Sequence, residues 1–260
     1  MPGHRARKRF GQHFLTDPGV VDTILRAIHA TKDDVVVEIG PGQGAITAAL
    51  AATAGRLHAV ELDRDLASRL RRQYDDVENV TIHEADALAF DFSSLGDRLR
   101  IVGNLPYNIS TPLLFHLLKV RDRIIDMHFM LQKEVVDRMA AAPGSKAYGR
   151  LGIMLGCHLN IESLFDVDRS AFDPPPQVTS AVVRLDPLPP GTFSIEDDAL
   201  LSKIVTSAFM KRRKTIRNSL KDIVEVSDLD AVGIDAGLRP EQISISKYVQ
   251  LSNHLASPLR

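Results

Sequence analysis

The sequence predicts an α/β protein, a Rossmann-like doubly wound sheet with helices on both faces, followed by a small all-helical region. Short apolar runs rich in β-branched residues alternate with amphipathic stretches over the first two thirds of the chain. The first of these runs, residues 34–39, ends in a glycine-rich turn at 40–44, and a helical pattern follows over 45–54. Residues 195–260 show only helical periodicity. Strand, glycine turn and helix form the first unit of a doubly wound fold, and a purely helical tail indicates a separate region.

The composition is typical of a globular protein, and the overall charge does not attract nucleic acid. Hydrophobic residues make up 44% of the chain, and the formal net charge is −1, so attraction to a polyanion would have to come from local clusters. The single cysteine, Cys157, excludes an internal disulfide and a cysteine-rich metal site. We therefore expect a reducing cytosol and no metal centre. No apolar run approaches the roughly 18 residues of a membrane span, and no apolar stretch follows the basic N-terminus.

The N-terminal residues form a basic arm followed by an amphipathic helix. Four cations stand close together, namely Arg5, Arg7, Lys8 and Arg9, and taken alone they indicate a solvated tail. Apolar residues then recur at helical spacing from Val20 to Ile28. This spacing predicts one helix before the first strand.

The remaining elements follow from periodicity and from turn residues. Further strands are predicted over 56–60, 80–83, 99–103, 126–131, 159–167 and 177–185, and helices over 63–74, 113–120, 134–139 and 152–155. Residues 172–178 carry three prolines and predict a stiff extended loop. Residues 187–191 are rich in proline and predict a linker, so we expect one domain over 1–188 and a helical domain over 189–260.

Carboxylates near the glycine turn favour S-adenosylmethionine over a dinucleotide. Gly40, Gly42 and Gly44 alternate and lack the Gly-x-Gly-x-x-Gly spacing, and the turn carries no lysine. Glu61 lies about 20 positions beyond the turn, where a ribose hydroxyl pair is usually held, and Asp86 follows the next strand. These carboxylates would repel the negatively charged pyrophosphate of a dinucleotide. S-adenosylmethionine has no phosphate and carries a sulfonium cation, which nearby carboxylates favour.

The fourth strand ends in Asn104-Leu105-Pro106-Tyr107, which combines two acceptors with an aromatic ring. Pro106 restricts Leu105 to an extended conformation, so the Asn104 side-chain oxygen and the Leu105 carbonyl would be held in place. A planar base with an exocyclic amine, such as adenine, suits this group. The tetrapeptide alone is equally consistent with a strand that stops at a proline turn.

A second cationic group stands in the helical region. Its members are Lys211, Arg212, Arg213, Lys214 and Arg217, with no acidic residue among them. Such a run indicates a phosphate-binding patch at least as well as a solvated face.

Together these motifs resemble the ribosomal RNA adenine dimethyltransferases, most closely their KsgA type, which modifies small-subunit rRNA. The resemblance is carried by residues 38–44, Glu61, Asp86 and residues 104–110. It extends to residues 8–15, to the pattern Phe-x-Pro-x-Pro-x-Val-x-Ser over 172–180, and to residues 212–220. It implies a class I methyltransferase sheet, S-adenosyl-L-methionine as cofactor, and small-subunit rRNA in a pre-30S particle as partner. Nothing in the sequence requires a dimer, and we expect a monomer.

The resemblance also implies roles for individual cofactor residues. His13 and Leu15 would belong to the segment that closes over the methionine end of S-adenosylmethionine, and Gly40 would approach that same end. Glu61 would hold the ribose hydroxyls, and Asp86 would accept from the adenine amine.

On the substrate side, Asn104 would contact both cofactor and base, with the Leu105 carbonyl and Pro106 completing the motif. Phe172 would stack on the target base opposite Tyr107. The basic arm and the Lys211–Arg217 cluster would contact phosphates.

Three alternatives follow from the same residues. An Erm-like enzyme acting on large-subunit rRNA shares the core motifs, although residues 212–219 favour the small-subunit type. A DNA adenine methyltransferase is disfavoured because 260 residues show no target-recognition domain. A ribosome-assembly factor or transcription factor could keep the fold and bind RNA without catalysis.

Overall fold

A computed structural model describes residues 12–256, which divide into two compact units. The first unit runs to Val136 and includes Glu162–Pro187, and the second comprises Asp137–Ile161 and the chain from Leu188 onward. The linker expected near residue 188 coincides with one change of unit. Residues 137–161 belong to the same unit as the C-terminal helices. The single domain boundary expected at residue 188 does not account for this segment. The basic arm at Arg5, Arg7, Lys8 and Arg9 lies outside the described residues.

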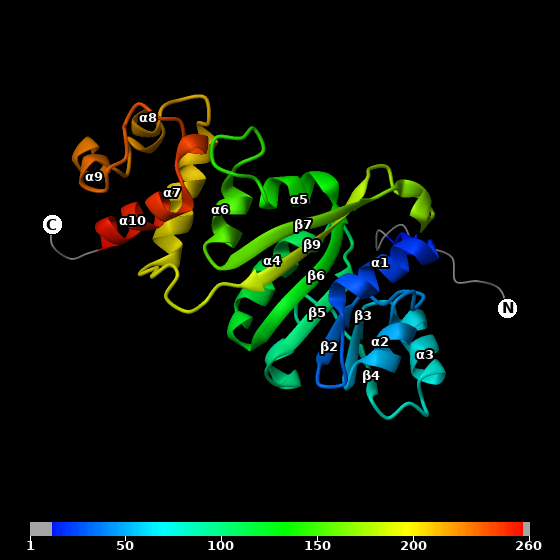
Figure 1. Cartoon of the computed structure of the whole chain (residues 1–260). Helices are drawn as coiled ribbons and strands as arrows, with labels where there is room; N and C mark the ends of the chain where they lie inside the picture. The colour runs from blue at the N-terminus through cyan, green and yellow to red at the C-terminus, as the bar shows by residue number, and fades with distance from the viewer. Residues whose placement is uncertain (1–11, 257–260) are drawn as a thin grey trace. The chain divides into compact units, whose positions relative to one another are not determined.

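A seven-stranded sheet forms the centre of the first unit (Figure 1). Its order is β4-β3-β2-β5-β6-β9-β7, with β4 (Val80–Glu84), β3 (Arg56–Glu61), β2 (Val35–Ile39), β5 (Leu99–Asn104), β6 (Ile124–Gln132), β9 (Ser180–Pro187) and β7 (Leu159–Val167). The pairs from β4 to β6 are parallel, and β9 runs antiparallel to β6. The carboxyl ends of the parallel strands therefore lie along one edge, where Glu61 and Asn104 are the last residues of β3 and β5.

Helices cover both faces of this sheet, which confirms the predicted α/β class (Figure 1). They are α1 (Pro18–Ile28), α2 (Thr47–Thr53), α3 (Arg64–Gln73), α4 (Ser110–Leu118) and α5 (Lys133–Met139). Helix α4 begins three residues before the expected start because Pro112 lies in its first turn, where no backbone N–H is required. Strand β9 begins at Ser180 and not at 177, after the proline-rich loop.

Side chains along each strand point alternately to the two faces of the sheet, one of which is covered by α1. Val102, Met130 and Val182 pack on the α1 face together with Ile24 and Ile28 of that helix. Asp17 caps α1 by accepting hydrogen bonds from two backbone N–H groups of its first turn. The α1 face is thus an apolar layer that reaches the strand ends.

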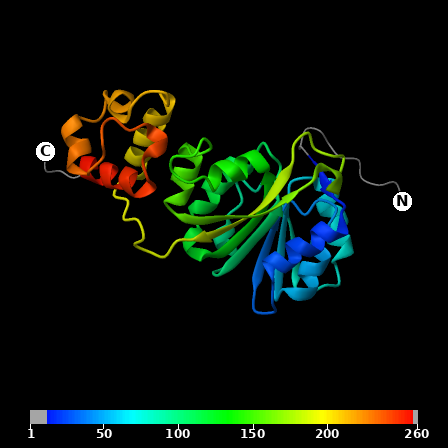
Figure 2. The ribbon, with the colours of Figure 1, turned by 45° about the horizontal axis from the view of Figure 1, so that its top comes forward.

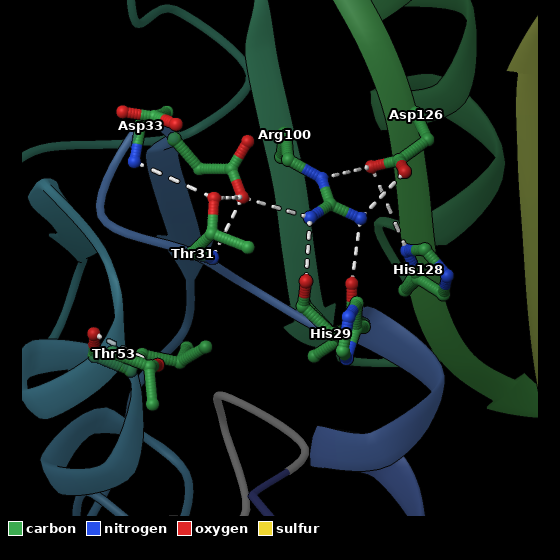
Figure 3. A network of polar contacts seen from close by, with 10 residues as sticks. His29, Thr31, Asp33, Thr53, Arg100, Asp126 and His128 are labelled. Carbon is green, nitrogen blue, oxygen red and sulfur yellow. Dashed lines mark hydrogen bonds and ion pairs between the residues drawn. The ribbon is translucent and has the colours of Figure 1, made fainter.

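A buried ion-pair network fixes the C-terminus of α1 to the sheet (Figure 3). Arg100 of β5 makes two hydrogen bonds to the Asp126 carboxylate of β6, at 3.0 and 2.7 Å. The same guanidinium donates to the main-chain oxygens of Ile28 and His29 at the end of α1 and to Asp34 before β2. A cation at a helix C-terminus is favourable, and one side chain here joins three segments.

A separate two-stranded sheet joins the N-terminal segment to the proline-rich loop. Strand β1 (Phe14–Leu15) pairs antiparallel with β8 (Phe172–Asp173), so that Leu15 lies opposite Phe172. Both views show the yellow-green segment that carries β8 beside the start of α1 (Figures 1 and 2). The pairing holds the start of the described chain against the first unit.

The second unit consists of helices, as predicted for the C-terminal region. They are α6 (Arg150–Gly156), α7 (Asp198–Met210), α8 (Ile216–Leu220), α9 (Val226–Ala231) and α10 (Ile245–Ala256). The buried phenols of Tyr148 and Tyr248 donate to the Ile243 and Pro240 carbonyls, and the Phe209 ring lies between them at 6.4 Å from each. No helix among residues 12–256 has the length and apolar character that crossing a membrane requires.

Candidate active site

A cavity of about 260 Å³ opens at the carboxyl ends of the parallel strands in the first unit. The predicted residues that line it are His13, Leu15, Gly40, Glu61, Asp86, Asn104, Leu105, Pro106 and Tyr107. These residues come from five segments that are far apart in the sequence. The structure therefore brings together every described cofactor and base residue expected in the first unit except Phe172.

The glycine turn after β2 adopts a conformation that side chains disfavour. Gly40 and Gly42 have φ angles of 67° and 59°. A Cβ atom added at Gly42 would lie 3.1 Å from the Phe14 ring. The Gly42 backbone N–H donates a hydrogen bond to Glu61 Oε2 at 3.0 Å. The turn thus presents bare backbone to the cavity and is fixed to the end of β3.

Two carboxylates occupy the ends of β3 and β4. Glu61 is 6% exposed, and its second oxygen accepts from the Asp63 N–H at 2.8 Å. Burial raises the pKa of Glu61, while these two backbone donors act in the opposite direction. Asp86 is exposed at the rim, and its Oδ1 accepts from the Leu88 N–H at 2.9 Å, its one side-chain hydrogen bond within residues 12–256.

Among the lining residues outside the predicted set, Glu38 and Leu62 bear most directly on ligand binding. Glu38 is 2% exposed, and its Oε2 has no hydrogen-bond partner within the described chain. Burial raises the pKa of Glu38 to about 7, and the charge of Glu61 adds to the effect. Leu62 directly follows Glu61 and is 51% exposed, which leaves an apolar surface beside that carboxylate. The alternation along β2 places Glu38 on the same side as Val36, but burial of its carboxylate has no local sequence signal.

The Asn104 motif carries two acceptors without protein donors. Asn104 Nδ2 donates to the His13 main-chain oxygen at 3.0 Å, and its Oδ1 has no partner within residues 12–256. The Leu105 N–H donates to the Met130 carbonyl at 3.2 Å, while no described group donates to the Leu105 carbonyl. The amide orientation of Asn104 is therefore set by His13, the residue before β1, and two acceptors remain for a ligand.

Tyr107 is held at both its ring and its hydroxyl. The His13 ring lies nearly parallel to it, with centroids 6.0 Å apart and planes at 25°. The Tyr107 hydroxyl shares a hydrogen bond of 3.0 Å with Ser180 Oγ, and Ser180 is 1% exposed. His13 Nδ1 donates to the Pro174 carbonyl at 2.7 Å. The proline-rich loop and the start of β9 thus orient this ring.

Phe172, which is expected to stack on the target base opposite Tyr107, is buried in the apolar cluster of this structure. Phe172 is 4% exposed and packs in the apolar cluster with Leu15, Ile24 and Met130. It is not part of the cavity lining. Its pairing partner Leu15 does line the cavity, so Phe172 supports the wall from behind.

The cationic cluster lies in the second unit and is partly neutralised. Lys211 pairs with Asp222 at 3.5 Å, and Arg212 lies 3.8 Å from Glu241 while donating to the Lys146 carbonyl. Although no acidic residue stands within the run, carboxylates from later segments therefore pair with two of its five cations. Arg213, Lys214 and Arg217 are exposed and have no ion pair within the described residues. No group of three or more His, Cys, Asp or Glu side chains in residues 12–256 could hold a metal ion.

Comparisons with known proteins agree with the geometry. Residues 3–257 match the family model described as ribosomal RNA adenine dimethylase. The chain is 53% identical over 257 residues to a ribosomal RNA small subunit methyltransferase A of Aromatoleum aromaticum, covering 99% of this chain and 97% of that protein. A protein of the same name from Thiobacillus denitrificans is 55% identical over 98% and 99% of the two chains.

A solved structure extends the likeness to the whole fold. It is a dimethyladenosine transferase from Plasmodium falciparum, with a TM-score of 0.77 and 26% identity over 92% of this chain and 96% of that one. The family model, the full-length relatives and the cavity at the strand ends all lead to the same assignment, which confirms the resemblance. The chain belongs to the ribosomal RNA adenine dimethylase family.

Proposed function

We propose that this protein dimethylates the N6 amines of two adjacent adenosines in the 3′-terminal hairpin loop of small-subunit rRNA, with S-adenosyl-L-methionine as methyl donor. The main support is that two acceptors, Asn104 Oδ1 and the Leu105 carbonyl, have no donor among residues 12–256. They lie in a cavity that is also lined by carboxylates. From the resemblance of its motifs we further propose that the protein acts on a pre-30S particle in the cytoplasm during small-subunit assembly, as a monomer.

The cavity residues suit S-adenosylmethionine. The bare turn at Gly40 and Gly42 allows close approach of an amino-acid moiety, and Glu61 and Asp86 supply carboxylate oxygens for ribose hydroxyls and an adenine amine. Exposed Leu62 would cover an apolar ring face. When bound, this cofactor supplies a methyl group on a sulfonium sulfur. His13 and Leu15 would close the methionine end.

The base side of the cavity would make an adenine amine nucleophilic by positioning it. The N6 lone pair of adenine is delocalised into the ring, which makes the amine a poor nucleophile. Donation of its two hydrogens to Asn104 Oδ1 and the Leu105 carbonyl would favour a pyramidal nitrogen with a localised lone pair. Tyr107 would stack on a base taken out of its helix, an interaction worth about 1–3 kcal/mol.

The reaction needs no strong base in the protein. In each transfer one N6–C bond forms, one S–C bond breaks, and one N6 proton leaves to solvent while a neutral thioether remains. After methyl transfer N6 carries a positive charge until this proton leaves, so the proton is strongly acidic. Solvent water is a sufficient proton acceptor. The described chain contributes orientation and electrostatics.

Cations outside the cavity would hold the RNA backbone. Arg213, Lys214 and Arg217 are exposed, and Lys211 and Arg212 stand beside them with carboxylate partners. The arm at Arg5, Arg7, Lys8 and Arg9 is proposed as a second phosphate contact from its composition.

The test is labelled methyl transfer to small ribosomal subunits from a strain that lacks this modification, with the modified nucleotides mapped. The proposal expects N6,N6-dimethyladenosine at two adjacent positions near the 3′ end of the rRNA. Label that appears only in large-subunit rRNA would instead indicate an Erm-like specificity. Tight binding to small subunits without any methyl transfer would indicate an assembly factor.

A further inference from the structure

The second methyl transfer to one nitrogen poses a steric problem that the cavity must solve. After the first transfer, N6 carries one methyl group and a single hydrogen, so it can satisfy only one of the two acceptors at Asn104 and Leu105. The methyl group then takes the direction in which an N–H had pointed. A second transfer requires space for that group beside the acceptors, with the lone pair still directed at the donor.

Two apolar residues that line the same cavity lie beside Asn104 in the sheet. Asn104 of β5 is directly opposite Met130 of β6, and Met130 is directly opposite Val182 of β9. Met130 and Val182 are 3% and 1% exposed, and both line the cavity. Directly opposed residues share a face of a sheet, so these side chains stand on the Asn104 side of the strands.

Two further apolar residues come from other elements. Leu15 of β1 and Ile24 of α1 line the cavity and belong to the same cluster as Met130 and Val182. His128, one of the polar lining residues, is directly opposite Val102, which lies two residues before Asn104 on β5, a separation of roughly 7 Å at the usual rise. Met130, Val182, Leu15 and Ile24 therefore form an apolar part of the cavity wall, which is lined elsewhere by polar side chains such as His13 and Tyr107.

We propose that Met130 and Val182 form a methyl recess that receives the first N6-methyl group and thereby permits dimethylation. This inference rests on the proposed function and adds the residues that determine product multiplicity. A methyl group occupies about as much space as one water molecule, roughly 30 Å³ of liquid volume, so a small apolar part of the cavity wall can receive it. An apolar group gains by entering such walls, whereas the acceptors beside them retain the remaining N–H.

The experiment compares two adjacent valines of β9 that face opposite sides of the sheet. Val182→Ile adds one methylene to the recess, and Val183→Ile adds the same group on the other face, where Val183 is equally buried. Single-turnover methylation of undermethylated small subunits gives the rates of the first and second transfer by mass spectrometry of the nucleosides. Val182→Ile is expected to lower the ratio of second to first rate about tenfold, so that N6-methyladenosine accumulates, while Val183→Ile keeps the wild-type ratio.

A binding measurement without cofactor provides an independent readout. Hairpin RNAs with adenosine or N6-methyladenosine at the target position are titrated into the cofactor-free protein. Val182→Ile should weaken binding of the N6-methyladenosine hairpin relative to the adenosine hairpin by severalfold, and Met130→Phe should do so more strongly. Equal rate ratios and equal binding preferences in the Val182 and Val183 variants would overturn the recess. Failure of the wild-type protein to methylate small-subunit rRNA at all would instead overturn the proposed function.

Discussion

The side-chain amide nitrogen of Asn104 lies 3.0 Å from the main-chain oxygen of His13, 91 residues earlier in the chain. This hydrogen bond fixes which end of the amide is the donor, because a carbonyl can only accept. Oδ1 is left for a ligand. The N-terminal segment thus determines which Asn104 atom, at the end of β5, is available to a ligand.

Replacing Asn104 by alanine removes the side-chain acceptor while leaving the Leu105 carbonyl. We expect methyl transfer to fall by two or more orders of magnitude, as for loss of a preorganised hydrogen-bonding group, with cofactor affinity changed severalfold at most. Calorimetric titration of S-adenosylhomocysteine and single-turnover methylation separate the two effects. A variant with unchanged turnover would refute the role given to Asn104.

The bond between Tyr107 and Ser180 is expected to orient the stacking ring. Tyr107→Phe and Ser180→Ala each remove this one hydrogen bond, and each should lower kcat/KM about five- to tenfold, as the loss of roughly 1 kcal/mol would. The double variant should be no worse than either single variant, because both remove the same interaction. Additive losses would show that Ser180 acts elsewhere. Ser252→Ala is the matched control, because Ser252 is fully buried and its hydroxyl has no partner in the described chain.

Arg100 is expected to be the most sensitive charged residue for stability. Arg100→Met leaves Asp126, whose side chain is 4% exposed, without its partner and frees the end of α1. The free energy of unfolding should fall by about 3–5 kcal/mol, measured by denaturant titration. Arg123→Met removes a surface pair with Asp97 and should cost at most about 1 kcal/mol. Equal losses in both variants would contradict a buried-pair origin.

The residues that the sequence located correctly are those whose role follows from a strand end. Glu61 and Asn104 close buried strands, and parallel strands bring such ends together whatever the rest of the chain does. The burial of Phe172 was not predicted, because it depends on pairing with Leu15, 157 positions away, which no local pattern reveals. The same holds for Lys211 and Arg212, whose acidic partners Asp222 and Glu241 come from later segments.

The exposed cations of the cluster are expected to dominate its contribution to RNA affinity. Arg213→Gln with Lys214→Gln removes two charges that have no carboxylate partner, and the slope of log affinity against log salt should fall by about 2. Lys211→Gln with Arg212→Gln breaks existing pairs and should change the slope less. Filter binding of the target hairpin at several salt concentrations measures both. Identical slopes in wild type and the Arg213/Lys214 variant would identify the cluster as a solvated surface.

Glu38 is expected to make folding stability depend on pH near neutrality. Its pKa rises from 4.5 to about 7 on folding, so the folded state binds the proton more tightly than the unfolded state. Stability from this group is therefore fully present below pH 4.5 and declines as the pH rises through 7, by about 3 kcal/mol at most. Glu38→Gln keeps the shape without the ionisation, so the variant should gain stability relative to wild type between pH 5 and pH 8. Urea titrations at both pH values measure the difference, with exposed Glu162→Gln as control. If the difference in unfolding free energy between wild type and Glu38→Gln does not change with pH, the Glu38 carboxyl ionises alike in the folded and unfolded states. The buried wall of the cavity would then not hold a neutral acid.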